Sequence, residues 1–65
     1  MDKDLLIYYM KKNNISIERM CEELKISRSA FYRKLNGSTE FVLSEIQKIT
    51  ELLKLESPTV IFFTK

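Results

Sequence analysis

The side chains best suited to binding chemistry lie in one basic segment, residues 27–37, which read SRSAFYRKLNG. This segment holds two arginines, one lysine and no acidic residue, so its net charge is +3. Residues 1–26 are neutral, and residues 38–65 carry a net charge of −1. Because a guanidinium group binds phosphates and can also bind the O6 and N7 atoms of guanine, the segment predicts an anionic partner such as a nucleic acid.

Catalytic and metal-binding chemistry has little support in the composition. The chain has no His, one Cys and one Gly, so it lacks an imidazole base, a thiolate metal cluster and a glycine-rich phosphate loop. We therefore expect no enzyme activity, no metal and no cofactor. Cys21 is expected to be a small core residue, because Met20 and Leu24 beside it are apolar and the two glutamates that follow it raise the pKa of a thiol.

Length and composition predict one small domain over residues 1–65. The chain is 45 % hydrophobic and 31 % charged, which is typical of a soluble folded protein. No run approaches the ~20 apolar residues of a membrane span, and the acidic start, MDKD, is unlike a signal peptide. A single cysteine fits a reducing compartment, so a cytoplasmic location is expected.

The basic segment is positioned by two short predicted helices, over 17–24 and 28–35, joined by a tight turn. Ser16 and Ser27 precede these helices, and a serine hydroxyl there accepts a backbone N–H and caps the helix. Gly37 follows the second helix and can take the left-handed conformation that ends it. The pattern therefore predicts a helix-turn-helix over residues 16–37.

The second of these helices has a distinct inner and outer face. Phe31 and Leu35 are four residues apart and face the core, whereas the positions around the rest of the helix are polar or basic. A polar, cationic second helix is the element that a helix-turn-helix sets in the major groove of DNA. Arg28 and Arg33 could be solvated surface charge, but their place on this helix favours a role in binding.

The rest of the chain is expected to be helical as well. A first helix should run from about Asp2 to Asn13, with Leu6, Tyr9 and Met10 buried. A helix over about 43–54 has an apolar stripe at helical spacing, formed by Leu43, Ile46, Ile49 and Leu53. Phe41 should plug the core from the loop 37–42.

The C-terminal apolar run leaves two alternatives. Ser57 and Pro58 are a helix start signal and favour a last short helix. The stretch TVIFF is also rich in β-branched and aromatic residues, which suit a strand. Without a partner strand we favour the helix, so the predicted fold is all-α, a compact bundle of four to five short helices.

The stretch ELKISRSAFYRKLNG, followed by EFVLSEIQKI, resembles the Cro/C1-type (XRE family) helix-turn-helix domains of phage repressors and bacterial regulators. The resemblance covers about residues 4–63. It implies a lambda repressor-like bundle whose recognition helix is residues 27–35. It also implies a double-stranded DNA partner, bound by a dimer at a short inverted repeat.

The resemblance also implies which residues contact DNA. Base contacts are expected from Arg28, Ser29, Tyr32 and Arg33. Phosphate contacts are expected from Ser16, Ser27, Lys34, Asn36 and Ser38. Tyr32 has the alternative of packing at the edge of the domain.

Four positions depart from the family pattern. Lys25 stands in the turn where Gly is usual, which requires a strained left-handed residue or a different turn. Cys21 replaces a usual Ala and is still compact. Ile17 replaces a Gln that often contacts DNA, and Val42 replaces a Thr that often caps the following helix, so that cap is lost.

The predicted function is a sequence-specific transcriptional regulator, a phage or prophage repressor acting as a homodimer on an inverted-repeat operator. The dimer contact is expected in the apolar run Val60, Ile61, Phe62 and Phe63. Four successive apolar residues cannot all face one core, although the two phenylalanines could instead fold back and complete it. The rival function is a protein-interaction module, antirepressor, adaptor or antitoxin-like, which need not keep residues 27–37 free of acids.

Overall fold

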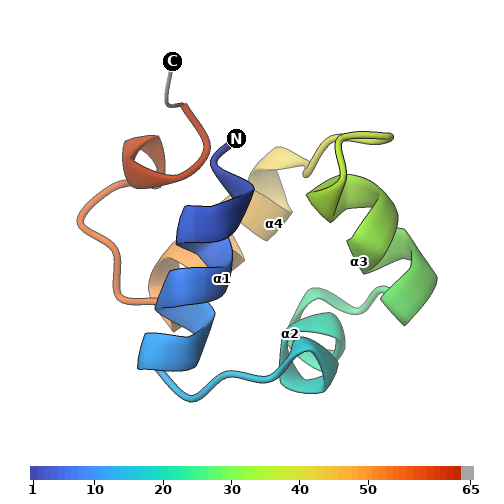
Figure 1. Cartoon of the computed structure of the whole chain (residues 1–65), viewed down its shortest axis with the longest axis horizontal. Helices are drawn as coiled ribbons and strands as arrows, with labels where there is room; N and C mark the ends of the chain where they lie inside the picture. The colour runs from blue at the N-terminus through green and yellow to red at the C-terminus, as the bar shows by residue number, and fades with distance from the viewer. Residues whose placement is uncertain (64–65) are drawn as a thin grey trace.

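The computed structural model describes residues 1–63, and these are helical, with no strand among them (Figure 1). The helices are α1 (Lys3–Lys12), α2 (Ile17–Leu24), α3 (Arg28–Leu35), α4 (Leu43–Leu52) and the short 3-10 helix η1 (Pro58–Val60). Figure 1 shows α2 and α3 together on one side of the molecule and α1, α4 and η1 on the other. The all-α prediction is confirmed, and the strand alternative for the C-terminal run is excluded.

Three of the four α-helices begin with a side-chain cap. Asp2, Ser16 and Ser27 each accept a hydrogen bond from the backbone N–H three residues further on, at 3.0, 3.0 and 3.1 Å. α4 begins differently, because the Val42 side chain has no acceptor atom. There the Glu45 carboxylate instead accepts the Val42 N–H at 2.9 Å.

All four α-helices end in the same way. Within two residues after the last residue of each helix stands one with a positive φ: Asn14 (57°), Lys25 (58°), Gly37 (87°) and Lys54 (55°). The next residue in each case donates its N–H to the carbonyl five residues back, at 2.8 to 3.1 Å, which is the Schellman motif. Of the two alternatives considered for Lys25, the structure shows the left-handed residue, and the turn accepts the strain of a non-glycine residue.

A single apolar core joins the helices. Its buried members are Leu6, Met10, Met20, Cys21, Leu24, Phe31, Leu35, Phe41, Ile46, Ile49, Leu53 and Ile61. Phe31 is fully buried, and its ring packs edge-on against Phe41 at 6.1 Å between centroids. Phe41 thus fills the core from the loop before α4, as predicted. Tyr9, which was expected to be buried, is only half-buried.

The prediction that Leu43 belongs to the buried stripe of α4 is wrong, because Leu43 is 65 % exposed. Side chains on a helix lean toward its N-terminus. Since Leu43 is the first residue of α4, its side chain points past the end of the core. The buried stripe begins one turn later, at Ile46.

The C-terminal run divides between core and surface. Ile61 is fully buried, Phe62 is half-buried against Phe41 with 5.7 Å between ring centroids, and Phe63 is 59 % exposed. The carbonyl of Ile61 also accepts the N–H of Asp2 at 2.9 Å, which ties this run to the start of α1. The run does complete the core, as one alternative expected. Its core residues are Ile61 and, in part, Phe62, whereas the alternative named Phe62 and Phe63. The Ile61 side chain therefore cannot reach a second subunit.

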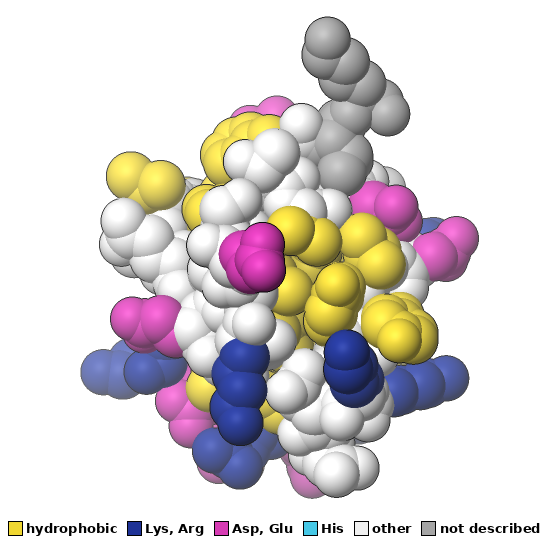
Figure 2. Space-filling model, turned by 90° about the vertical axis from the view of Figure 1, so that its left-hand side faces the viewer, with side chains coloured by type: hydrophobic (Ala, Val, Ile, Leu, Met, Phe, Trp, Pro, Cys, Tyr) yellow, Lys and Arg dark blue, Asp and Glu magenta, His cyan; other side chains and the backbone are white. Residues whose placement is uncertain are grey.

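Figure 2 shows hydrophobic side chains gathered on the side of the molecule where η1 and the segment before it lie in Figure 1, with basic side chains below them. Within residues 1–63, no helix is long and apolar enough to cross a membrane.

Candidate nucleic-acid interface

α3 presents four polar or basic side chains to solvent. Phe31 and Leu35 are buried on its inner face. The outer face carries exposed side chains, namely Arg28, Ser29, Tyr32 and Arg33. The structure therefore brings all four predicted base-contacting residues onto one exposed face of α3, and the major groove of B-DNA admits an α-helix.

The starts of α2 and α3 carry the two predicted serines. Ser16 and Ser27 are exposed, and each hydroxyl oxygen accepts a backbone N–H of its own helix. A hydroxyl also has a hydrogen to donate, and the start of a helix is electrostatically favourable for anions. Both serines are thus placed to donate to phosphates while they continue to cap their helices.

The loop after α3 carries the other predicted phosphate contacts. Asn36, Gly37 and Ser38 are exposed. The Ser38 N–H donates to the Arg33 carbonyl at 2.9 Å, so this part of the loop is fixed to the last turn of α3. The side chains of Asn36 and Ser38 thus extend from the same end of α3 that carries Arg33.

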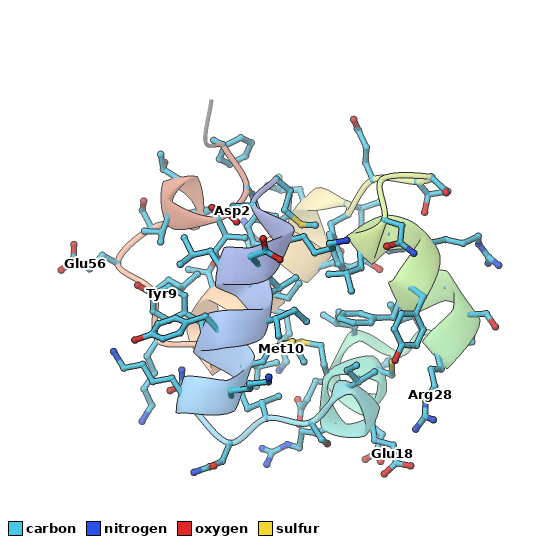
Figure 3. The ribbon with its side chains drawn as sticks, viewed as in Figure 1. Asp2, Tyr9, Met10, Glu18, Arg28 and Glu56 are labelled. Atoms are coloured by element: carbon cyan, nitrogen blue, oxygen red, sulfur yellow. The ribbon has the colours of Figure 1, made fainter. Side chains whose placement is uncertain are left out.

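Arg28 is the member of the outer face with an acidic partner. Its Nη2 donates to Oε1 of Glu18 on α2 at 3.2 Å, and the two side chains are 60 % and 75 % exposed (Figure 3). Exposed ion pairs of this kind contribute about 0–1 kcal/mol. Arg28 can therefore exchange this carboxylate for a phosphate or a base edge at low cost.

Tyr32 packs at the edge of the domain, the alternative considered from the sequence, and is also partly exposed. Its ring packs edge-on against Phe31 with 6.1 Å between centroids, yet the residue is 41 % exposed. The inner edge of the ring extends the core, and the outer part lies on the same face as the arginines.

Lys34, for which a phosphate contact was expected, lies apart from this exposed face. Its ammonium group bonds Oε1 of Glu45 on α4 at 2.7 Å, and its side chain is only 14 % exposed. Lys34 stands three residues after the buried Phe31 on α3, and residues at this spacing are neighbours on a helix, so its side chain lies along the edge of the inner face. We therefore leave Lys34 out of the proposed contacts.

One cation near this face was not considered as a contact from the sequence. Lys25 lies exposed in the turn just before Ser27. Among residues 1–63 neither Lys25 nor Arg33 takes part in an ion pair. The signal was available, since a lysine in a turn next to a basic helix adds to the same positive patch.

Cys21 lies behind this face as a core residue. It is 8 % exposed, and its thiol lies 3.9 Å from the Ser27 carbonyl, to which it can donate. Burial raises the pKa of the Cys21 thiol, and the Arg28 guanidinium opposes this shift. The predicted core role is confirmed, with burial rather than neighbouring glutamates as the cause of the raised pKa.

Comparison with known proteins agrees with this geometry. The family model described as the Cro/C1-type HTH DNA-binding domain matches residues 6–59. No curated protein and no solved structure matches the chain. The matched range spans most of the chain and includes α2, the turn and α3, so this chain belongs to the family of Cro/C1-type helix-turn-helix DNA-binding domains.

Proposed function

We propose that this chain is a sequence-specific transcriptional regulator that reads double-stranded DNA with α3 in the major groove. The observation that carries the proposal is the division of α3 into a buried apolar face and an exposed face with Arg28 and Arg33. An arginine on such a helix binds guanine O6 and N7 in a bidentate manner. Membership in the family supports the same role.

The proposed contacts fall into two classes. Base contacts come from the outer face of α3, through Arg28, Ser29, Tyr32 and Arg33. Phosphate contacts come from the helix starts, the turn and the loop, through Ser16, Lys25, Ser27, Asn36 and Ser38. Phosphate contacts fix the position of α3, and base contacts select the sequence.

We further propose that the protein acts as a phage or prophage repressor, bound as a dimer to an inverted repeat. A dimer places two recognition helices about one helical turn of DNA apart, roughly 10 base pairs. Val60 and Phe63 remain available for the dimer contact, since Val60 is half-buried and Phe63 is exposed. The apolar face in Figure 2 offers further surface for a second copy.

Selection of bound sites from random duplex DNA tests this function. The expected result is an inverted-repeat consensus, with two copies of the protein per site by sedimentation. A double variant, Arg28→Ala with Arg33→Ala, serves as the control and should enrich no consensus. Failure of the unsubstituted protein to enrich any sequence would support the rival function of a protein-interaction module.

A further inference from the structure

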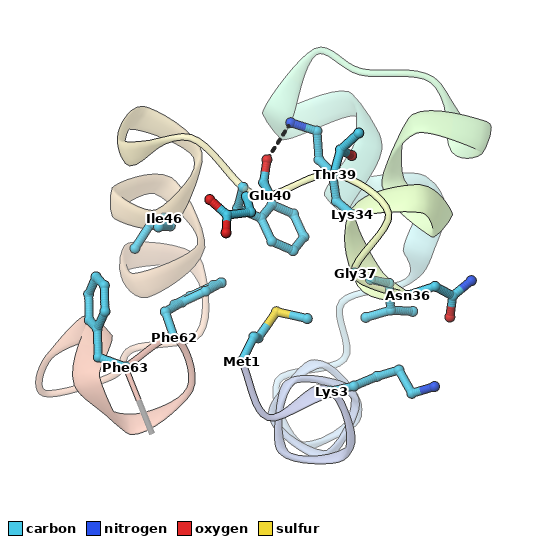
Figure 4. A pocket seen from close by; sticks show the side chains of 12 residues that line it. Met1, Lys3, Lys34, Asn36, Gly37, Thr39, Glu40, Ile46, Phe62 and Phe63 are labelled. Atoms are coloured by element: carbon cyan, nitrogen blue, oxygen red, sulfur yellow. Dashed lines mark hydrogen bonds between the residues drawn. The ribbon is translucent and has the colours of Figure 1, made fainter. Parts of the chain in front are cut away.

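A buried ion pair joins the end of α3 to the start of α4. The Lys34 ammonium and the Glu45 carboxylate are 2.7 Å apart, with side chains 14 % and 10 % exposed. Lys34 also donates to the backbone carbonyl of Glu40 at 3.4 Å (Figure 4), and Glu45 accepts the N–H of Val42 at 2.9 Å. The pair therefore holds the loop between α3 and α4 at two points of its own backbone.

Lys34 of this pair also contacts an aromatic side chain of the loop. The Lys34 ammonium lies over the Phe41 ring, 5.8 Å from its centroid. Phe41 in turn packs between Phe31 and Phe62. Because Lys34, Glu40 and Phe41 are held together, the path of the loop is fixed relative to the last turn of α3, where the proposed phosphate contacts Asn36 and Ser38 begin.

Two bonds, to the Glu45 carboxylate and the Glu40 carbonyl, hold the Lys34 ammonium within the fold. If the ammonium moved out to a phosphate, the Glu45 carboxylate would remain buried without its cation, which is costly. Glu45 would also still be needed to satisfy the N–H of Val42, which has no cap of its own.

We propose that Lys34 is a positioning residue for DNA binding. It acts through Glu45 and Glu40 to hold the loop that presents Asn36 and Ser38, and it does not neutralise a phosphate itself. This inference rests on the proposed function. It assigns to a buried pair the role of setting the geometry of a phosphate-contacting loop.

The salt dependence of DNA binding separates positioning from direct contact. The logarithm of the binding constant falls with the logarithm of salt concentration, by about 0.9 for each phosphate neutralised. Lys34→Met loses one partner of a buried pair and with it stability, so it is titrated at a temperature at which circular dichroism shows it folded. Under these conditions it should weaken binding to the selected site roughly tenfold and leave this slope unchanged. Lys25→Met, the matched control at a proposed phosphate contact, should weaken binding and reduce the slope by about 0.9.

For Glu45→Gln, positioning and simple electrostatics predict changes in DNA affinity of opposite sign. Removing a negative charge near DNA strengthens binding if only electrostatics matter. Positioning predicts that Glu45→Gln weakens binding, and that the double variant with Lys34→Met is no weaker than either single variant. Ile61→Val, a core truncation outside α3, α4 and the loop between them, controls for lost stability and should leave DNA affinity unchanged below its melting temperature.

Two results would overturn the inference. A slope reduced by about 0.9 in Lys34→Met would make Lys34 a phosphate contact. Unchanged or stronger binding by Glu45→Gln would show that the pair does not position the loop for DNA binding. If instead the unsubstituted protein showed no DNA binding in the same titration, the proposed function would be wrong, and the inference with it.

Discussion

The two faces of α3 each carry a cation in an ion pair, but one pair is nearly buried and the other is mostly exposed. On the inner side Lys34 bonds Glu45 at 2.7 Å with both side chains nearly buried. On the outer side Arg28 bonds Glu18 at 3.2 Å with both side chains mostly exposed. Removing one partner of a buried pair costs about 3–5 kcal/mol, whereas an exposed pair contributes about 0–1 kcal/mol. A cation on this helix is therefore either part of the fold or available to a ligand, and burial decides which.

The largest effect is expected at the centre of the inner face. Phe31→Ala should cost about 3–5 kcal/mol of stability, because the ring is fully buried and packs against Phe41 of the loop before α4. A small domain has only about 5–15 kcal/mol in total, so the variant should be unfolded or nearly so. Thermal melts followed by circular dichroism measure this change.

The neighbouring residue on the outer face provides the control for that result. Tyr32→Ala removes a ring that is 41 % exposed and should lower the melting temperature far less than Phe31→Ala does. If the two variants melted at similar temperatures, the assignment of inner and outer faces would be wrong.

The next effect concerns DNA and not folding. Arg28→Ala and Arg33→Ala should each weaken binding to the selected site by about 1–3 kcal/mol if they read bases, with melting temperatures near that of the parent. Fluorescence anisotropy with selected and random duplexes distinguishes the two kinds of contact. Equal losses on both duplexes would assign the arginine to a phosphate, and no loss on either would remove it from the interface.

The features of the fold that were predicted correctly depend on local sequence. Ser16 and Ser27 cap the helices that follow them, and Gly37 ends α3, because a cap or a Schellman motif involves residues within one turn. The separation of Phe31 from the arginines follows from helical period alone. These local rules are enough to predict which residues form the outer face of α3, without knowledge of any tertiary contact.

The features that were missed depend on contacts between distant segments. Lys34 pairs with a residue 11 positions away on another helix, and nothing near Lys34 in the sequence indicates this partner. Half of the signal was present, since Glu45 stands three residues after Val42, as in a capping box. Ile61, not Phe63, enters the core because the predicted last helix is only the short 3-10 helix η1, which ends at Val60, and Ile61 to Phe63 lie in the turn that follows it.

A smaller effect should come from the acidic partner of the outer face. Glu18→Gln frees Arg28 and removes a negative charge beside the proposed DNA surface, so binding to random and selected duplexes should strengthen by about 0–1 kcal/mol. Glu22→Gln changes the same charge on the same helix at an exposed position without an ion pair among residues 1–63. An equal effect of the two substitutions would show that general charge, not the pair with Arg28, is responsible.

The smallest change in stability is expected in the turn between α2 and α3. Lys25→Gly relieves a left-handed residue with φ of 58°, worth about 1–2 kcal/mol. The larger freedom of glycine in the unfolded chain offsets about 0.4–1 kcal/mol of this gain. The variant should therefore melt at or slightly above the parent temperature. Gly37→Ala is the reciprocal control: it places a side chain at φ of 87° with no atom within 4 Å of its Cβ, so backbone strain alone should lower its melting temperature.

DNA binding by the same variant separates the conformation of the turn from its charge. If the Lys25 ammonium contacts a phosphate, Lys25→Gly reduces the salt slope by about 0.9 while stability is kept. Lys25→Asn tolerates the left-handed conformation and removes the charge, so it should reduce the slope equally. An unchanged slope in both variants would confine the DNA surface to the outer face of α3 and the helix starts. A fall in melting temperature for Lys25→Gly would mean that the lysine side chain, and not relief of backbone strain, governs the stability of the turn.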